Sequence, residues 1–422
     1  MKAFKVFGPC KLEGEVHVQG AKNAVLPIMS AIILQDLPVL LRNVPQVQDV
    51  FTMIELLKIL GARIEWKGKN ELLVDPSTIR NYIAPYEIVN RMRASIYVLG
   101  PLLMKFGKAE VSFPGGCAFG PRPIDFHLNG LTLLGADLEI ERGYIKATME
   151  RPRATEISLN FKSVGTTIHL MTTASFIEGE TTLINCAQEP EVVTTAEFLV
   201  KSGVNIDGAG TDVIRIKGVK KLKSLPEFDI IPDRIEAGTY LTAGFMTAGK
   251  VKVVDCEPQH LEPVIIKLRE AGAKIQKGKG FVSVEPRKKS IRSLHLETQP
   301  FPGFPTDMQP QFMSMLTVAK GTSMIKEGIY PNRFSHAFEL QRLGAHIKVV
   351  EPTALVEGVD RLTGAEVTGQ DLRGSAALVL AGMIAEGTTT VFGIEHLERG
   401  YENFREKLVS LGAKIVVLNE NH

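Results

Sequence analysis

The stretch Leu60-Gly61-Ala62-Arg63-Ile64 returns near the other end of the 422-residue chain as Leu411-Gly412-Ala413-Lys414-Ile415. The same phrase occurs six times: a glycine, a small apolar residue, any residue and an apolar residue, always after a helical pattern. Its glycines follow one another at intervals of 74, 68, 69, 72 and 68 residues and are Gly61, Gly135, Gly203, Gly272, Gly344 and Gly412. A glycine just past a helix favours the left-handed turn that ends it, so each phrase predicts a helix end leading into a strand.

A second feature repeats in phase with these glycines. A charged residue precedes an apolar, alanine-rich segment at six positions, which are Lys22, Arg93, Lys162, Arg234, Asp307 and Arg373. The segments that follow, such as 94–104, 235–247 and 374–385, are apolar on nearly all sides, which is typical of a buried helix. Between them lie runs with strand character, such as 181–184 and 250–254.

Together the two features predict six units of about 70 residues, as repeats at a fixed period do. Each unit has one wholly buried helix, one more amphipathic helix and several strands. Six such units predict an α/β protein with two domains of three units each, in which sheets surround the buried helices. The repeat does not show where the chain crosses between domains.

The composition is that of a globular protein with balanced charge. Hydrophobic residues make up 44% and charged residues 23%, and 49 Lys and Arg against 47 Asp and Glu leave a net charge of +2. This balance argues against a protein that binds nucleic acid or a membrane surface, which is usually strongly basic. No apolar run approaches the roughly 20 residues that cross a bilayer, and residues 1–5 do not resemble a signal peptide.

The four cysteines and nine histidines do not suggest a metal site, because none of them is paired at ligand spacing. The cysteines are Cys10, Cys117, Cys186 and Cys256. We therefore predict a reduced, cytoplasmic setting with free thiols, and no metal or other cofactor.

Five of the six residues that precede the buried helices are cations. Helix N-termini present free N–H groups and the positive end of the helix dipole, so they bind anions. If these ends face one cleft, that cleft should bind an anion-rich ligand. The alternative is that each cation is a solvated residue at a loop–helix junction, which is less favoured for the phased set because cations at helix starts oppose the dipole.

The segment 114–125 contains the cysteine with the most reactive surroundings. Glycines and prolines crowd around Cys117, and Arg122 follows closely, so the segment predicts a mobile loop that places a thiol beside a guanidinium. A nearby cation favours the thiolate and makes a cysteine reactive. The alternative is an inert cysteine in a surface turn. The other three cysteines adjoin strand-like runs and are interpreted as small hydrophobic residues.

Asp307 is the acidic exception in the phased set. A carboxylate facing a cationic cleft can act as a general base for a hydroxyl. The alternative, favoured on these residues alone, is a carboxylate that only stabilises a helix N-terminus. Arg333, Arg373 and Arg399 add guanidinium groups suited to bidentate binding of phosphate or carboxylate.

Eight motifs resemble those of the UDP-N-acetylglucosamine 1-carboxyvinyltransferases, a family of enolpyruvyl transferases, and they extend over essentially the whole chain. They are Gly20-Ala21-Lys22-Asn23, Met92-Arg93-Ala94-Ser95, Pro114-Gly115-Gly116-Cys117, Arg122-Pro123-Ile124-Asp125, Ser163-Val164-Gly165, Ile231-Pro232-Asp233-Arg234-Ile235-Glu236, Phe304-Pro305-Thr306-Asp307-Met308-Gln309 and Asp371-Leu372-Arg373. The resemblance implies an inside-out α/β barrel fold built from six βαβαββ units. It implies one domain of residues 22–231 with the Cys117 loop, a second of 1–21 plus 232–422, and an active site in the cleft between them.

The resemblance also implies the reaction. The enolpyruvyl group of phosphoenolpyruvate would pass to the 3′-hydroxyl of UDP-N-acetylglucosamine with release of phosphate, the first committed step of peptidoglycan biosynthesis. In an addition–elimination mechanism Cys117 would be the general acid and Asp307 the base. Cys117 would also be the site of a covalent phosphoenolpyruvate adduct and the target of fosfomycin, and its loop would close over the site.

The same resemblance implies the binding residues. Lys22, Arg122 and Arg399 would hold phosphoenolpyruvate, with Asn23 beside them and Arg373 in support. The residues implied for the nucleotide sugar and its surroundings are Arg93, Arg122, Pro123, Ile124, Asp125, Phe126, Lys162, Ser163, Val164, Gly165, Asp307, Ile329, Arg333 and Asp371. The partners would be these two small molecules, with no nucleic acid or membrane, and the chain would be a monomer or a weak homo-oligomer.

Three positions depart from the family pattern: Thr194 stands for a usual Asp, Pro310 for Ala and Pro331 for Glu. None removes a catalytic group.

Three alternative functions are less favoured. An enolpyruvylshikimate phosphate synthase shares the fold and the phosphoenolpyruvate donor, but it lacks the loop cysteine and has a Lys-Ser helix start that is absent here. A DNA-encircling clamp would carry basic residues along its helices, whereas the buried helices here are apolar. A non-catalytic paralogue that binds the sugar nucleotide would not need Lys22, Cys117, Asp307 and Arg399, which are all intact in this chain.

Overall fold

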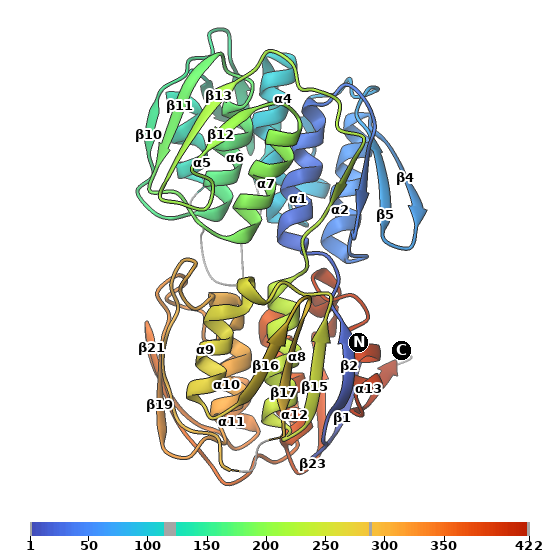
Figure 1. The fold of residues 1–422 in the computed structure, drawn as a ribbon, viewed down its shortest axis with the longest axis vertical. Helices are drawn as coiled ribbons and strands as arrows, with labels where there is room; N and C mark the ends of the chain where they lie inside the picture. Colours follow the sequence, from blue (N-terminus) through green and yellow to red (C-terminus); the bar gives the residue numbers. More distant parts are fainter. Residues whose placement is uncertain (1, 114–123, 287–288, 420–422) are drawn as a thin grey trace. The chain divides into compact units, whose positions relative to one another are not determined.

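The computed structural model describes residues 2–113, 124–286 and 289–419, and the chain forms two compact units (Figure 1). Residues 20–231 form one unit, and residues 1–19 together with 232–422 form the other. Each unit has its own hydrophobic core, one drawn from residues 21–230 and the other from residues 4–18 and 235–415. We call them the 20–231 unit and the 232–422 unit.

The 20–231 unit contains helices α1 (Lys22–Ala31), η1 (Ile32–Leu34), α2 (Gln48–Leu60), α3 (Tyr86–Val89), η2 (Arg93–Val98), α4 (Leu99–Phe106), α5 (Asp125–Leu133), α6 (Val164–Ala174) and α7 (Pro190–Lys201). Its strands are β3 (Val39–Arg42), β4 (Arg63–Gly68), β5 (Glu71–Asp75), β6 (Ile83–Ala84), β7 (Lys108–Ser112), β8 (Asp137–Glu141), β9 (Tyr144–Thr148), β10 (Glu156–Ser158), β11 (Gly179–Ile184), β12 (Asn205–Asp207), β13 (Val213–Gly218) and β14 (Glu227–Asp229).

The 232–422 unit contains helices α8 (Arg234–Met246), η3 (Pro258–Leu261), α9 (Glu262–Glu270), η4 (Thr306–Met308), α10 (Gln309–Leu316), α11 (Ser335–Arg342), α12 (Leu372–Ile384), η5 (Ile394–Arg399) and α13 (Phe404–Ser410). Its strands are β1 (Lys2–Gly8), β2 (Glu13–His17), β15 (Lys250–Val254), β16 (Lys274–Gly278), β17 (Phe281–Glu285), β18 (His295–Glu297), β19 (Thr322–Lys326), β20 (His346–Val350), β21 (Thr353–Glu357), β22 (Glu366–Thr368), β23 (Gly387–Phe392) and β24 (Lys414–Asn419).

The described strands form six four-stranded sheets, three in each unit, all with one pattern of pairing. In the 20–231 unit the orders are β14-β3-β5-β4, β6-β7-β9-β8 and β10-β11-β13-β12, and in the other unit β16-β17-β15-β2, β18-β19-β21-β20 and β22-β23-β1-β24. In each sheet one terminal strand pairs in parallel and the remaining pairs are antiparallel. The parallel partner can come from far away in the chain. The pairing of β14 with β3 ties the two ends of the 20–231 unit together, and that of β2 with β15 joins the N-terminal segment to the rest of its unit.

The six glycines of the repeated phrase each follow a helix and precede a strand, as the sequence predicts. Their φ angles lie between 91° and 109°, in the left-handed region. After each of the six the next residue is Ala or Val with a backbone N–H bonded to a carbonyl five residues earlier, as in Ala62 to Leu57 and Ala413 to Leu408. This is the bond of a Schellman helix end, which a residue with a side chain at the glycine position would strain.

Of the three apolar segments named above as examples of buried helices, two are single helices. Every residue of α8 from Ile235 to Met246 is buried, as is α12 from Arg373 to Met383. The segment 94–104 is instead divided into η2 and α4. Because Pro101 has no N–H to offer the Tyr97 carbonyl, an α-helical bond is missing there, and Ser30 Oγ donates to that carbonyl at 2.7 Å.

Helices lie between sheets within each unit (Figure 1). In the 20–231 unit α1, α6 and α7 are seen between the sheet of β10–β13 and the strands β4 and β5. Among the described residues no helix is both long and apolar enough to span a bilayer. The described His, Cys, Asp and Glu side chains likewise form no group of three or more that could hold a metal ion.

Candidate active site

Lys22 begins α1 and is held by a carboxylate that the sequence analysis did not single out. Its Nζ lies 3.0 Å from Oδ2 of Asp49, and the two side chains are only 13% and 6% exposed. Asp49 lies in the first turn of α2, where a carboxylate is also favoured by the helix dipole. Asn23, the next residue of α1, is exposed.

The start of α6 presents free backbone N–H groups beside a cation. Ser163 caps the helix, because its Oγ accepts from the Thr166 N–H at 3.2 Å. Val164 and Gly165 form the first turn and are partly buried. Lys162 stands one residue before the cap and pairs through Nζ with Asp212 Oδ1 at 2.5 Å. This helix start suits an anionic ligand.

The neighbouring predicted residues also lie at helix starts. Arg93 begins η2 and is partly buried. Ile124 is buried and precedes α5, whose first turn holds the exposed Asp125 and the partly buried Phe126. Three predicted residues, Cys117, Arg122 and Pro123, lie outside the described residues.

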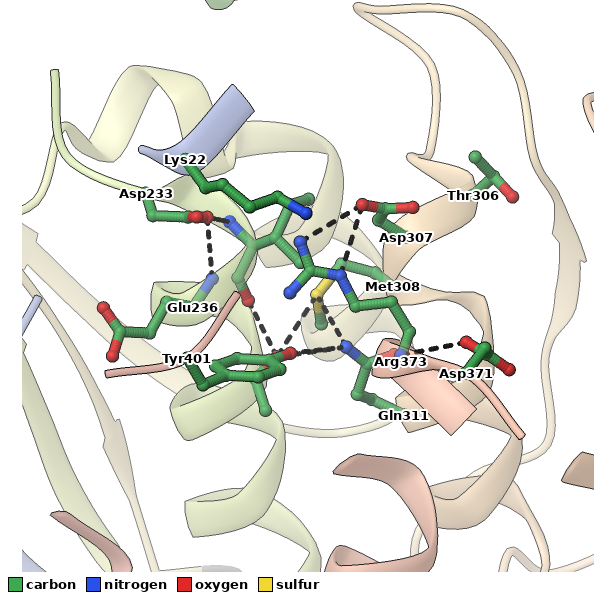
Figure 2. Close-up of polar contacts among 12 residues, drawn as sticks. Lys22, Asp233, Glu236, Thr306, Asp307, Met308, Gln311, Asp371, Arg373 and Tyr401 are labelled. Atoms are coloured by element: carbon green, nitrogen blue, oxygen red, sulfur yellow. Dashed lines mark hydrogen bonds and ion pairs between the residues drawn. The ribbon is translucent and has the colours of Figure 1, made fainter. Parts of the chain in front are cut away.

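In the 232–422 unit two arginines converge on Asp307. Arg333 Nη1 lies 2.8 Å from Asp307 Oδ1. Both Nε and Nη2 of Arg373 lie 3.2 Å from Asp307 Oδ2 (Figure 2). The arginine side chains are 3% and 2% exposed, whereas that of Asp307 is 29% exposed. The two guanidinium groups stabilise the ionised carboxylate, and its exposed part can still reach a ligand.

A buried polar network contacts Arg373. The Arg373 guanidinium carbon lies 5.0 Å from the centre of the Tyr401 ring. The Tyr401 hydroxyl lies 2.9 Å from Thr239 Oγ1 and 3.3 Å from Gln311 Nε2 (Figure 2). Thr239 donates its own proton to the Ile235 carbonyl at 2.7 Å, so Tyr401 must donate to Thr239. Burial raises the pKa of the Tyr401 hydroxyl, which keeps it neutral.

Arg373 stays charged although it is buried. Burial alone would lower the pKa of Arg373, but the facing Tyr401 and Asp307 raise it, and the net shift is upward. Arg373 is therefore a permanent cation inside the core of the unit. Asp371 caps the same helix by accepting from the N–H groups of Arg373 at 2.9 Å and Gly374 at 3.0 Å.

A second carboxylate missed by the sequence analysis positions the loop of Ile329. Glu327 is buried, and its Oε1 accepts from the backbone N–H groups of Ile329 at 3.0 Å and Tyr330 at 3.1 Å. Its Oε2 accepts from Thr306 Oγ1 at 3.1 Å, and Thr306 in turn accepts from Arg333 Nη1 at 2.9 Å. Ile329 is thus tied through buried groups to the residues around Asp307.

Arg399 and the three positions that depart from the family pattern are also described. Arg399 ends η5 and is partly buried, two residues before Tyr401. Thr194 is buried in α7, and Pro331 is exposed in the segment between β19 and α11. Pro310 lies in the first turn of α10, where a missing N–H costs nothing.

The three described cysteines have unreactive surroundings. Cys10, Cys186 and Cys256 are free thiols, and the last two are buried. Burial raises the pKa of Cys10 to about 11, of Cys186 to about 12 and of Cys256 to about 11. All three are protonated near neutral pH, in agreement with their interpretation as small hydrophobic residues.

Comparison with known proteins gives the family. The sequence model of the family described as EPSP synthase (3-phosphoshikimate 1-carboxyvinyltransferase) matches residues 6–408. The UDP-N-acetylglucosamine 1-carboxyvinyltransferase of Proteus mirabilis is 49% identical over 422 residues, which cover 100% of both chains. UDP-N-acetylglucosamine 1-carboxyvinyltransferase 1 of Caldanaerobacter subterraneus subsp. tengcongensis is 51% identical over 405 residues, 96% of each chain.

Solved structures share the fold. The enolpyruvyl transferase NikO from Streptomyces tendae superposes with a TM-score of 0.90 at 25% identity, covering 99% of this chain and 98% of the other. An EPSP synthase from Acinetobacter baumannii gives a TM-score of 0.77 at 17% identity, covering 99% of this chain and 100% of the other. The second likeness concerns the fold alone.

Proposed function

Because this chain belongs to the UDP-N-acetylglucosamine 1-carboxyvinyltransferase family of enolpyruvyl transferases, we propose that it joins phosphoenolpyruvate to the 3′-hydroxyl of UDP-N-acetylglucosamine and releases phosphate. This is the first step of peptidoglycan synthesis. The observation that carries the proposal at the level of the site is the partly exposed Asp307 carboxylate between two buried arginines. Such a group can take a proton from a sugar hydroxyl.

The proposed reaction is an addition followed by an elimination. The Cys117 thiol protonates the methylene carbon of phosphoenolpyruvate while Asp307 accepts the proton of the 3′-hydroxyl, whose oxygen bonds to the central carbon. Loss of a proton from the new methyl group and departure of phosphate then restore the double bond. Arg333 and Arg373 hold the Asp307 carboxylate in place for the first step.

Lys22 and Arg399 supply positive charge for the phosphate and carboxylate of phosphoenolpyruvate, with Asn23 beside them. The pairing of Lys22 with Asp49 supports this role, because it fixes a flexible ammonium group before the substrate arrives. Arg122 completes the phosphate contact. Cys117 acts as the acid, carries the covalent phosphoenolpyruvate adduct and reacts with fosfomycin.

For the nucleotide sugar, the support comes from the helix starts. The N–H groups of Val164 and Gly165 begin α6 beside Lys162, an arrangement that suits a diphosphate. The other nucleotide contacts proposed are Arg93, Pro123, Ile124, Asp125, Phe126 and Ile329. Cytoplasmic location and a monomeric or weakly associated state stay predictions.

Phosphate release tests the proposal. The purified chain is given phosphoenolpyruvate with either UDP-N-acetylglucosamine or shikimate 3-phosphate as the acceptor. We expect release only with the nucleotide sugar, and a drop in kcat of about 100-fold or more in Asp307→Asn, because a positioned base contributes about 10²–10⁴-fold. Asp255→Asn, at a carboxylate 67% exposed on the same unit, is the control. Turnover with shikimate 3-phosphate alone would contradict the proposal.

A further inference from the structure

Two histidines are paired inside the 20–231 unit. His127 lies in α5 and His169 in α6, and they are 7% and 1% exposed. Their Nδ1 atoms lie 3.0 Å apart. One of these nitrogens must carry a proton and the other a lone pair, because two bare or two protonated nitrogens would repel each other.

The backbone decides which nitrogen carries the proton. The Gly100 N–H donates to His169 Nε2 at 2.9 Å, so that nitrogen has the lone pair. A neutral imidazole carries one proton, and that of His169 is therefore on Nδ1. His169 then donates to His127 Nδ1, which leaves the proton of His127 on Nε2.

Gly100 is free to donate in this way because the helix is interrupted. The segment 93–98 is a 3₁₀-helix, and the N–H of Leu99 bonds to the Ile96 carbonyl, the acceptor that an α-helix would assign to Gly100. Any side chain at Gly100 would place its Cβ 2.9 Å from His169 Nε2 and 2.0 Å from Thr173 Oγ1. The absence of a side chain is what lets His169 approach this backbone.

Both imidazoles are neutral. Burial, and then the charge of Arg93, lowers the pKa of His127 to about 3. Burial, and then its partner His127, lowers the pKa of His169 well below its ordinary value. The order of donors and acceptors is therefore constant over the physiological pH range.

The remaining N–H of His127 points to the start of α6. No described residue is a hydrogen-bond partner of His127 Nε2, although the side chain is more than nine-tenths buried. A Cβ at Gly165 would lie 3.5 Å from this nitrogen and 3.4 Å from the Tyr97 hydroxyl. The nitrogen itself is not fully enclosed, so an acceptor oxygen of a ligand can reach this N–H.

We propose that His169 holds His127 in the Nε2–H tautomer, and that this N–H donates to an acceptor oxygen of the uridine nucleotide bound at the start of α6. His169 is a positioning residue, and His127 is the residue that touches the ligand. The identity of the nucleotide rests on the proposed function. The tautomer does not rest on it.

Nitrogen-15 NMR of the ligand-free chain tests the first half. Histidine is labelled, and the imidazole signals of residues 127 and 169 are identified by their loss in His127→Asn and His169→Asn. We expect His127 protonated at Nε2 alone and His169 at Nδ1 alone, unchanged between pH 6 and 8. A proton on Nδ1 of His127, or a charged ring at either position, overturns the proposal.

Nucleotide affinity tests the second half. We expect His127→Phe to weaken binding of UDP-N-acetylglucosamine about 10- to 100-fold, the range for one hydrogen bond to a charged group. His169→Phe should weaken it by a smaller factor, because His127 can then adopt either tautomer. His169→Asn should restore binding, since its amide offers one donor and one acceptor. His346→Asn, at a site 68% exposed on the other unit, should have no effect.

Binding of UDP and of uridine distinguishes an acceptor oxygen on the phosphates from one on the nucleoside. A loss in His127→Phe for UDP alone assigns the N–H to phosphate, and an equal loss for both assigns it to the nucleoside. Unchanged affinity for both ligands in a folded His127→Phe chain overturns the inference and leaves the proposed function intact. A parent chain that binds no uridine nucleotide overturns both the proposed function and the ligand half of the inference, whereas the NMR result still decides the tautomer.

Discussion

The ammonium group of Lys22 lies 3.0 Å from the carboxylate of Asp49, 27 residues further along the chain, with both side chains almost fully enclosed. A lysine side chain ordinarily samples many rotamers, and its confinement costs conformational entropy. The ion pair meets this cost when the chain folds, before any substrate binds. Lys22 is therefore oriented in advance for an anionic ligand.

Replacing the carboxylate should loosen Lys22. We expect Asp49→Asn to raise KM for phosphoenolpyruvate about tenfold while KM for the nucleotide sugar changes little, because the amide cannot hold the ammonium group by charge. Steady-state kinetics with each substrate varied in turn measures the two constants. Glu55→Gln, on the same helix and paired with the exposed Arg91, is the control. An unchanged KM for phosphoenolpyruvate would argue against orientation by Asp49.

The hydroxyl of Tyr401 should matter for catalysis through Arg373. Tyr401→Phe keeps the ring beside the guanidinium but removes the donor to Thr239. We expect the free energy of unfolding to fall by about 1–2 kcal/mol. We also expect kcat to fall several-fold with little change in KM, because Arg373 then holds Asp307 less firmly. Denaturation and steady-state kinetics measure both, with the exposed Tyr86→Phe as the control. A parent-like kcat would show that the aromatic ring alone positions Arg373.

Glu236 should make stability depend on pH. The side chain is fully buried, with Oε1 2.7 Å from Lys407 Nζ and Oε2 accepting from the Gln19 N–H at 3.1 Å. Burial raises its pKa from 4.5 to about 7, and Lys407 offsets only part of this. Between these values the folded chain binds more protons than the unfolded chain, so stability falls as pH rises.

Glu236→Gln removes this proton uptake. From pH 5 to pH 8 we expect the difference in unfolding free energy between variant and parent to shift in favour of the variant by about 1–3 kcal/mol. Urea denaturation at several pH values measures this difference. Glu178→Gln, at a side chain 69% exposed, should show the same pH dependence of the unfolding free energy as the parent. A difference that is constant with pH would mean that Glu236 is ionised throughout the range.

Alkylation by fosfomycin should single out Cys117. The pKa values of Cys10, Cys186 and Cys256 are raised to about 11, 12 and 11, so these thiols contain almost no thiolate near neutral pH. Mass spectrometry of the treated chain should place the adduct on Cys117. Cys117→Ser should lose both the adduct and most activity, whereas Cys117→Asp should keep activity without the adduct, because a carboxyl group is an acid but a poor nucleophile towards the epoxide. An adduct on another cysteine, or parent-like turnover by Cys117→Ser, would refute the assignment.

The parts of the fold that depend on neighbouring residues could be predicted. Gly61 and its five counterparts mark helix ends because a left-handed residue is required there locally, and the segments after Arg234 and Arg373 are buried because they are apolar on all sides. The same local reasoning failed for 94–104. Pro101 is visible in the sequence, but the Ser30 and His169 side chains that bond the freed backbone groups come from other helices.

The sequence alone determined where helices end, which helices are buried and, through its motifs, which family the chain belongs to. Only the tertiary structure decided that Asp49 holds Lys22, that Tyr401 and Gln311 belong to the buried network at Arg373, and that one histidine donates a hydrogen bond to the other. The physical reason is how far apart in the sequence the interacting residues lie. A helix end or an apolar face is specified by residues a few positions apart, whereas an ion pair or hydrogen bond in the core joins side chains from elements that only packing brings together.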